Sequence, residues 1–375
     1  MSATTLFSTS INPRNNVVLD EHQSGLNKKH LHHLFLTHTN TMATMQRVVV
    51  TRFDPSDILS TLEVHSAPVP VPKDGEILVK MTMRPINPAD IFSIMGVYPG
   101  FAPAQLPACP GLEGCGEIAD ANGCAGMTAG MRGVVFCNTK DGQGSWQEFV
   151  AVSASAFLPV PASCSDSSAA QFLVNPVTVV GMLDALAAPE GEYILQSAAG
   201  SVLGRQLITL AKKRGLKTIN LIRRAAQGPE LLAHGADHVI CTEEEDVVAR
   251  VKEITDGKGA WGACEAVAGD LTEKVTASVR VGGTVIIYGA MSGIEFKGSV
   301  VDVLFRNVTI RGFWLNIWLS AMSVEQKSDL FASILGMLSD GTCVPMEGQT
   351  FELKDIRAAV AHAQAPARGG KTLLR

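Results

Sequence analysis

The chain has 375 residues, 46% of them hydrophobic and 18% charged, which is enough for two domains with separate hydrophobic cores. Its formal net charge of -5 comes without a basic stripe, so the composition argues against nucleic-acid binding. No apolar run reaches the ~18 residues that a membrane-spanning helix needs, so we expect a soluble protein with no membrane span.

Residues 1–44 differ in composition from the rest of the chain. Serine, threonine, asparagine and histidine dominate them, and hydrophobic periodicity is absent apart from the LHHLFL patch. We expect this segment to be disordered or to target an organelle, although the acids Asp20 and Glu21 are unusual in a transit peptide. An over-extended start is the second interpretation, because Met42 and Met45 are alternative first residues.

From Met45 the pattern changes to short strands separated by turns rich in proline and glycine. Residues 84–121 interrupt these strands with a long loop region around one short helix, Pro88 to Met95. Loops of this length in a compact protein usually carry function, so we expect catalytic residues there. The strands themselves are predicted over residues 45–53, 76–83, 131–138 and 145–161.

A regular alternation of strands and helices begins at Ser165. One helix is predicted over 165–187, with Ser165 as its cap and a kink at Asn175-Pro176. The alternation then predicts a parallel, doubly wound sheet, and hence an α/β fold. Its strands and helices are expected at 192–198, 202–214, 217–222, 229–235, 237–241, 245–255, 261–267, 270–280 and 282–289. Residues 307–319 add a strand and an aromatic turn, and the part from Ser323 completes the first domain.

The stretch 192–224 has the pattern of a dinucleotide-binding βαβ unit. A short apolar run enters the small-residue turn Ser197–Ser201, an amphipathic run follows, and a second apolar run ends in Arg223-Arg224. Small residues let a pyrophosphate approach the N–H groups at the helix start. The turn alone is a weak signal, because Val202 stands where a middle glycine is common. Two arginines where an NAD site needs a carboxylate favour NADP(H).

The cysteines are scattered and form no C-x-x-C pair. We expect reduced, mostly buried thiols of an intracellular enzyme, without structural zinc. The eight positions are 109, 115, 124, 137, 164, 241, 264 and 343.

Nine local motifs occur in order between Met45 and Arg375: NPADIFSIMGVYPG, PGLEGCGEI, GSWQEF, LVNPVT, ILQSAAGSVLG, TINLIRR, GGTVIIYGAM, RGFWL and GGKTLL. Together with the order of elements, they resemble the medium-chain dehydrogenase/reductase superfamily, and within it the trans-2-enoyl thioester reductases of mitochondrial fatty-acid synthesis. The resemblance implies an NADPH-binding Rossmann-type domain at 171–319. It also implies a partly open, GroES-like catalytic domain at 45–170 and 320–375.

The zinc-dependent branch of this superfamily needs a cysteine before the first helix and a histidine beside a glutamate. The corresponding places here read Asn87-Pro88-Ala89-Asp90 and Leu112-Glu113. We therefore expect no metal site, and without a Lewis acid the reaction requires a proton donor.

Tyr98 is the candidate proton donor. A phenol with a pKa of about 10 stays protonated at neutral pH, so it can hydrogen-bond a thioester carbonyl or protonate an enolate. Its position alone favours a packed loop tyrosine, but it falls on the tyrosine that the enoyl reductases use as proton donor. The resemblance implies reduction of a trans-2-enoyl thioester, with hydride from NADPH adding to C3 and a proton to C2.

The same resemblance assigns further site residues. The cofactor contacts would be Asn175, Thr178, Gly200, Ser201, Val202, Leu203, Arg223, Arg224, Tyr288, Gly289, Ala290, Met291, Phe313, Trp314, Leu315 and Lys371. Arg224-Ala225 departs from the family's usual Arg-acid-Arg order, which leaves Arg223 as the firmer phosphate ligand. Asn87 and Trp146 match family positions near the substrate pocket, with helix capping and core packing as their alternatives.

Two other functions stay open on this evidence. A zinc-free NADPH quinone oxidoreductase would share the fold and the cofactor, and a regulatory protein could bind NADPH without catalysis. The family suggests a homodimer, with the NVTIRGFW run as a pairing edge. It also suggests a mitochondrial location, with the cytoplasm or a plastid as alternatives, and an acyl group carried on CoA or on an acyl carrier protein.

Overall fold

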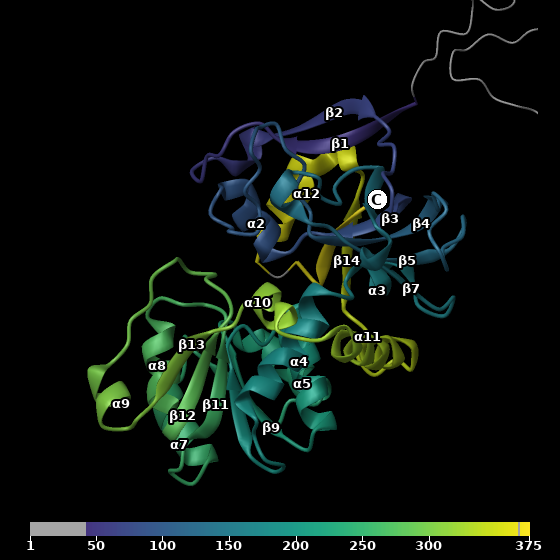
Figure 1. The fold of residues 1–375 in the computed structure, drawn as a ribbon. Helices are drawn as coiled ribbons and strands as arrows, with labels where there is room; N and C mark the ends of the chain where they lie inside the picture. Colours follow the sequence, from purple (N-terminus) through teal and green to yellow (C-terminus); the bar gives the residue numbers. More distant parts are fainter. Residues whose placement is uncertain (1–42, 367) are drawn as a thin grey trace, which may run out of the picture. The chain divides into compact units, whose positions relative to one another are not determined.

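The computed structural model describes residues 43–366 and 368–375, and all elements below belong to one unit, Thr44–Arg375 (Figure 1). The predictions for residues 1–42 lie outside the described residues. The strands are β1 Thr44–Val50, β2 Leu62–Pro68, β3 Glu76–Pro85, β4 Glu113–Asp120, β5 Arg132–Phe136, β6 Phe149–Ser153, β7 Phe157–Pro159, β8 Tyr193–Gln196, β9 Lys217–Ile222, β10 His238–Cys241, β11 Ala260–Glu265, β12 Val279–Ile287, β13 Thr309–Gly312, β14 Glu347–Phe351 and β15 Lys371–Leu374. The α-helices are α2 Pro88–Met95, α3 Asp166–Ala170, α4 Val174–Leu186, α5 Val202–Lys213, α6 Gly228–Ala233, α7 Val247–Ile254, α8 Leu271–Ser278, α9 Val300–Leu304, α10 Leu315–Ser320, α11 Val324–Ser339 and α12 Ile356–Gln364. Short 3-10 turns lie at Ile58–Thr61, Thr139–Asp141, Ala154–Ala156, Ala225–Gln227 and Leu353–Asp355.

Six parallel strands form the sheet of the middle part, in the order β10-β9-β8-β11-β12-β13. Numbered along the chain, this is the order 3-2-1-4-5-6 of a Rossmann-type doubly wound sheet. The order reverses between β8 and β11, whose register pairs Ile194 with Gly262 and Gln196 with Cys264. A crevice at the carboxyl ends of these two strands is where such sheets bind ligands.

Both faces of this sheet are buried, because neighbouring residues of each strand point to opposite sides. Ile194 of β8 packs in the cluster that contains α4 and α5, whereas Leu195 packs with residues of α7 and α8. In β11, Cys264 packs in the first of these clusters and Ala263 in the second. Short, continuously apolar strands between helices are the expected result of such two-sided burial.

A seven-stranded sheet is built from two distant parts of the chain. Its path is β14-β15-β3-β4-β5-β7, with β6 pairing β3, so the C-terminal strands join the N-terminal ones (Figure 1). Leu373 of β15 pairs with Pro85 of β3 in antiparallel register. β1 and β2 form a separate two-stranded sheet. One hydrophobic core is formed by strands β3 to β7, and another lies around α2 and α12.

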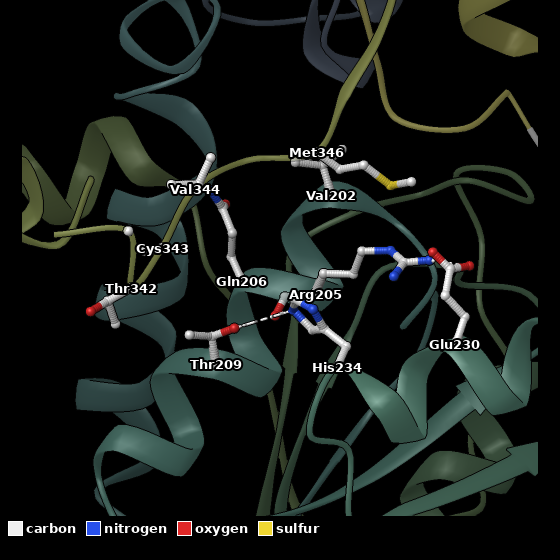
Figure 2. A pocket seen from close by; sticks show the side chains of 11 residues that line it. Val202, Arg205, Gln206, Thr209, Glu230, His234, Thr342, Cys343, Val344 and Met346 are labelled. Carbon is white, nitrogen blue, oxygen red and sulfur yellow. Dashed lines mark hydrogen bonds and ion pairs between the residues drawn. The ribbon is translucent and has the colours of Figure 1, made fainter. Parts of the chain in front are cut away.

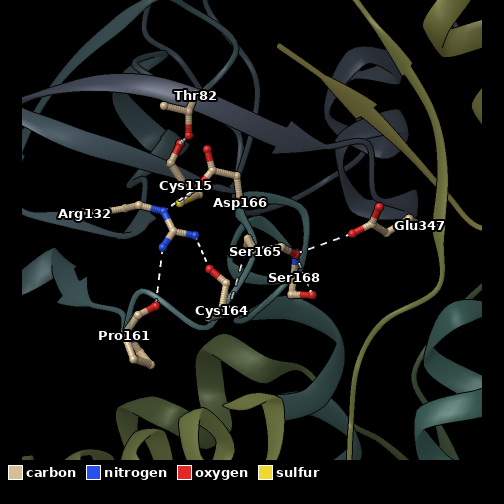
Figure 3. Close-up of polar contacts among 9 residues, drawn as sticks. All are labelled: Thr82, Cys115, Arg132, Pro161, Cys164, Ser165, Asp166, Ser168 and Glu347. Carbon is tan, nitrogen blue, oxygen red and sulfur yellow. Dashed lines mark hydrogen bonds and ion pairs between the residues drawn. The ribbon is translucent and has the colours of Figure 1, made fainter. Parts of the chain in front are cut away.

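Arg132 of β5 connects this sheet to α3 (Figure 3). Its guanidinium contacts the Asp166 carboxylate and donates to the carbonyl oxygens of Pro161 and Cys164. Ser165 caps α3 by accepting a hydrogen bond from the Ser168 N–H, as predicted from the sequence. The cap and the arginine together fix the start of the segment that leads into α4.

Three predicted elements were wrong in detail. The loop region expected at 84–121 ends in a strand, β4. The single helix expected at 165–187 is two helices, α3 and α4, separated by residues 171–173, so Asn175-Pro176 lies in the first turn of α4 and not at a kink. Proline fits there because the first-turn N–H groups have no helical partner. The aromatic turn expected after β13 includes the helix α10. The strands and helices predicted between 192 and 289 were confirmed, as was the short helix at Pro88–Met95.

Seven of the eight cysteines are buried and all eight are free thiols, as predicted for their burial and their lack of disulfides. In the part of the chain that the structure describes, no helix is long and apolar enough to cross a bilayer.

Candidate active site

The turn after β8 forms the floor of the predicted cofactor site. Ser201 caps α5 by accepting from the Gly204 N–H at 3.0 Å, while the N–H groups at the start of the helix remain available to an anion. A Cβ on Gly204 would lie 2.6 Å from the Ala199 carbonyl oxygen, so only glycine lets α5 approach this turn. Val202 is buried at the first helical position and presents its backbone N–H in spite of its side chain.

Sequence reasoning missed Glu265, which holds this turn in place. It ends β11 and is fully buried. One carboxylate oxygen accepts from the Ser197 hydroxyl at 2.9 Å and from the Val267 N–H at 2.8 Å; the other accepts from the Ala268 N–H at 2.7 Å. Glu265 therefore connects the ends of the two strands at which the sheet order reverses. An acid inside the apolar run WGACEAVAG was the available signal.

Arg223 and Arg224 follow the carboxyl end of β9, next to β8. The Arg223 side chain is exposed and that of Arg224 is half-buried. Among residues 43–366 and 368–375, neither guanidinium has an ion-pair or hydrogen-bond partner. In a Rossmann-type site, residues at the end of this strand contact the adenosine ribose. Both cations are therefore available to a 2′-phosphate.

Asn175 and Thr178 lie on one face of α4, three residues apart. Both are buried, and neither side chain has a hydrogen-bond partner within the described ranges. Buried polar side chains normally have a hydrogen-bond partner. Because Asn175 and Thr178 have none in the described ranges, both can bind a ligand.

The remaining predicted contacts lie at the ends of β12 and β13. Tyr288 donates its N–H to the Glu265 carbonyl oxygen at 2.9 Å, and burial raises the pKa of its phenol. A Cβ on Gly289 would lie 2.7 Å from the Ala266 carbonyl oxygen, so this chain segment passes close to β11. Phe313 donates its N–H to the Ile287 carbonyl oxygen at 2.9 Å. Ala290 is half-buried, Met291 is exposed, and Leu315 is buried at the start of α10.

Tyr98 is positioned by the end of α2. Gly96 ends the helix in the left-handed region, at φ 76°, where the Phe53 ring leaves no room for a Cβ. The N–H groups of Val97 and Tyr98 both bond the Phe92 carbonyl oxygen, and the Phe101 N–H bonds that of Tyr98. The backbone on both sides of the phenol is therefore fixed.

Tyr98 contacts Trp314, so the structure brings together two predicted site residues that are far apart in the sequence. The Trp314 indole N–H donates to the Tyr98 hydroxyl oxygen at 3.1 Å, and the rings meet edge to face with centroids 6.0 Å apart. Burial raises the pKa of Tyr98, the hydrogen bond from Trp314 lowers it, and the charge of Asp90 raises it again, with a net increase. The phenol is thus protonated at neutral pH, and its own O–H remains available to another acceptor.

Lys371 and Asn87 also meet. The Lys371 ammonium is buried and donates to the Asn87 side-chain oxygen at 2.7 Å; burial lowers the pKa of Lys371 to about 8. Asn87 precedes α2, but its side-chain amide bonds Glu113 and Lys371. Trp146 is fully buried in the core cluster around α2 and α12, a position that matches its core-packing alternative.

A cavity of about 310 Å³ lies beside α5, and Val202 is its only lining residue among the predicted contacts (Figure 2). In Figure 2 Arg205 points to Glu230, with which it forms a 3.0 Å ion pair, and His234 lies against Thr209. Neither Tyr98 nor a glycine of the turn after β8 lines this cavity. The described residues also contain no cluster of three or more His, Cys, Asp or Glu side chains placed to hold a metal ion.

Comparison with family models agrees with this architecture. Residues 73–162 match the alcohol dehydrogenase GroES-like domain, and residues 202–332 match a model described as zinc-binding dehydrogenase. The two family models and the strand order define an oxidoreductase of the medium-chain dehydrogenase/reductase type.

Individual relatives narrow the class. The chain is 35% identical over 286 residues to a mitochondrial enoyl-acyl-carrier-protein reductase of Arabidopsis thaliana, covering 74% of both chains. It is 30% identical over 328 residues to the enzyme of that name from Homo sapiens, covering 86% of both. The chain therefore belongs to the enoyl-acyl-carrier-protein reductase family.

Solved structures share the fold. A Bacillus thuringiensis protein assigned as an NADPH:quinone reductase superposes with a TM-score of 0.81 at 29% identity, covering 88% of this chain and 99% of that one. The Etr1p/NADP/crotonyl-CoA complex superposes with a TM-score of 0.77 at 22% identity, covering 89% of this chain and 100% of that one. At this identity the second likeness concerns the fold alone.

Proposed function

We propose that the chain reduces trans-2-enoyl thioesters, carried on CoA or on an acyl carrier protein, to saturated acyl thioesters. The observation that carries the proposal is the contact between Tyr98 and Trp314, because Trp314 is a residue that the family resemblance predicts to contact the cofactor. Membership of the enoyl-acyl-carrier-protein reductase family supports the substrate class.

Each group of residues in the site has a separate role in a conjugate reduction. Bound NADPH supplies the hydride that adds to C3 of the enoyl group. The α5 N-terminus and Arg223 hold its phosphates, and Asn175 and Thr178 offer polar contacts from α4. The Tyr98 hydroxyl, free to donate because Trp314 donates to it, stabilises negative charge on the thioester oxygen and supplies the proton.

A quinone is the rival substrate, and the Bacillus thuringiensis structure is the observation in its favour. The test is NADPH oxidation by the purified protein with crotonyl-CoA, 2-hexenoyl-CoA, an enoyl-acyl carrier protein and phenanthrenequinone. We expect turnover of the thioesters, with the preferred carrier revealed by kcat/KM. Efficient reduction of the quinone with no turnover of any thioester would assign the rival function.

A homodimer is part of the proposal, and α9 with the edge strand β13 would form its interface. Among the strands that the structure describes, β13 pairs with β12 alone. Val300, Val301, Leu304 and Phe305 of the neighbouring segment are all more than half exposed, which is unusual for a contiguous apolar set on a free surface. In solution, Phe305→Glu should reduce the molar mass measured by light scattering by half. The control change Val71→Glu, at an exposed apolar residue outside this segment, should not. A monomeric native protein would contradict this assembly.

The limits of the domains and the location also belong to the proposal. The catalytic domain would comprise 45–170 and 320–375, and the NADPH-binding domain 171–319. Mitochondrial names of the relatives support a mitochondrial location, with 1–44 as the transit peptide. A fluorescent fusion of the full chain should enter mitochondria, and one that starts at Met45 should not; entry of the shorter fusion would remove the targeting role.

A further inference from the structure

Glu113 is a buried carboxylate to which the proposed reaction gives no role. It begins β4, and only 1% of its surface is exposed. Its two oxygens accept three hydrogen bonds, from the Asn87 side-chain amide at 2.9 Å and from the N–H groups of Leu173 and Val174 at 2.9 and 3.0 Å. A buried charge with this many directed donors is held in one position.

The two backbone donors belong to the start of α4. Leu173 is the N-cap residue of that helix, and no side chain of its own segment caps it. Glu113 supplies the missing acceptor from another part of the chain, and its negative charge suits the positive end of the helix. Since Asn175 follows directly in the first turn, the position of this predicted cofactor contact depends on Glu113.

The third donor, Asn87, extends the network to Lys371. Its amide nitrogen donates to Glu113 while its amide oxygen accepts from the Lys371 ammonium at 2.7 Å. A flipped amide would place donor against donor on one side and acceptor against acceptor on the other, so the two charges fix its orientation. Within the described part of the chain, Lys371 has this one hydrogen-bond partner, which leaves two of its N–H groups for a ligand.

Asp90 ties the same network to the helix that carries Tyr98. One of its carboxylate oxygens accepts from the Asn87 N–H at 2.7 Å and the other from the Leu112 N–H at 3.1 Å. Asp90 thereby performs the capping of α2, and the Asn87 side chain is free to bridge Glu113 and Lys371. The starts of α2, β4, α4 and β15 are joined at one buried point.

We propose that Glu113 is a positioning residue that holds the Lys371 ammonium, through the Asn87 amide, and the first turn of α4 in one fixed relation to the bound cofactor. The proposal rests on the cofactor contacts assigned above but not on the substrate. Glu113 also keeps Lys371 charged, since its own charge favours the ammonium against the effect of burial.

The test is a titration of the full-length protein with NADPH, followed by cofactor fluorescence in the absence of any acyl substrate. In Glu113→Gln the new NH2 group must face either the Asn87 amide or the two backbone N–H groups, so at least one hydrogen bond is replaced by a donor–donor conflict. We expect NADPH to bind about tenfold to a hundredfold more weakly. Glu117→Gln changes an exposed residue of the same strand and should bind NADPH like the native protein.

The pH dependence separates positioning from a merely structural role. Burial lowers the pKa of Lys371 to about 8. Of the charged groups around it, Glu113 and Asp90 raise this pKa and Arg368 lowers it. An ammonium donates stronger hydrogen bonds to a bound cofactor than a neutral amine does, so NADPH affinity should be highest below this pKa and should fall as the pH rises through it. Without the Glu113 charge the pKa of Lys371 is lower, and the fall in Glu113→Gln should begin at a lower pH. Lys371→Met should abolish the fall.

Asn87→Leu provides a second variant, because it removes the bridge and leaves Glu113 bonded to α4. It should also weaken NADPH binding and shift the fall to lower pH. If either variant had a lower melting temperature but bound NADPH with the native affinity and the native pH profile, the proposal would be overturned. Because no acyl substrate is present, failure of the enoyl reductase assignment would leave these results unaffected.

Discussion

Replacement of Tyr98 by phenylalanine tests the centre of the proposed reaction. The change removes only the hydroxyl and keeps a ring that can still pack edge to face against Trp314. Loss of a positioned proton donor typically lowers turnover by a factor of about 10²–10⁴, and we expect kcat to fall in that range. The Trp314 N–H would also lose its 3.1 Å partner. At a half-buried indole this costs about 1 kcal/mol, or about a fivefold loss of NADPH affinity at most.

Two measurements separate these effects. Steady-state kinetics with crotonyl-CoA and saturating NADPH give kcat, and fluorescence titration without substrate gives the NADPH dissociation constant. Tyr193→Phe is the matched control, since Tyr193 begins β8 and contacts His238, away from the predicted contacts. A Tyr98→Phe enzyme with a kcat within about threefold of the native value would refute the role of the phenol as proton donor.

The ionisation of Tyr98 gives the same prediction a pH dependence. The pKa of the phenol is raised above its ordinary value of 10.0, principally by burial. The proton-donating form therefore persists through the usual assay range, and kcat should show no loss attributable to this group below about pH 10.

Three further substitutions test other parts of the structure. Arg223→Ala removes an unpaired guanidinium from the end of β9, so the preference for NADPH over NADH in kcat/KM should fall about tenfold to a hundredfold. Gly204→Ala places a Cβ 2.6 Å from the Ala199 carbonyl oxygen, so the free energy of unfolding should fall by about 1–3 kcal/mol, measured by denaturant titration, with weaker NADPH binding. Arg132→Gln breaks the ion pair with Asp166 and should lower the melting temperature by about 2–4 °C for each kcal/mol lost, with native kcat and KM.

The order of strands and helices in the middle part could be predicted because local pattern and burial agree there. Strands buried on both faces are short and continuously apolar, and α5 has one apolar and one polar face. α4 is buried on nearly all sides, so its sequence has no polar stripe whose interruption would reveal the break at 171–173. α10 exposes Ile317 and buries Leu315, which gives too short a pattern to distinguish a helix from an aromatic turn.

Site residues were predictable where their role depends on neighbours in the chain. The glycine turn and Arg223 could be assigned from their distance to predicted strands, because the backbone alone determines where they lie. The contact of Tyr98 with Trp314 joins residues that are 216 positions apart, and each motif gives the identity of one partner but not the pairing. The pKa increase at Tyr98 likewise depends on burial and on Asp90, which are properties of the folded chain.

Glu113 shows how a residue can be noticed in the sequence and still be misjudged. The sequence places it beside Leu112, where the zinc branch has a histidine, and the missing histidine removes the reason to consider the glutamate further. Glu113 is buried at the start of the strand EGCGEIAD, so its carboxylate nevertheless has to find donors on folding, because an unpaired buried charge costs several kcal/mol. The donors come from positions 26, 60 and 61 residues away, so only the folded chain identifies them. The glutamate that stands beside a histidine in the zinc branch here accepts hydrogen bonds from the start of a helix and from a side-chain amide.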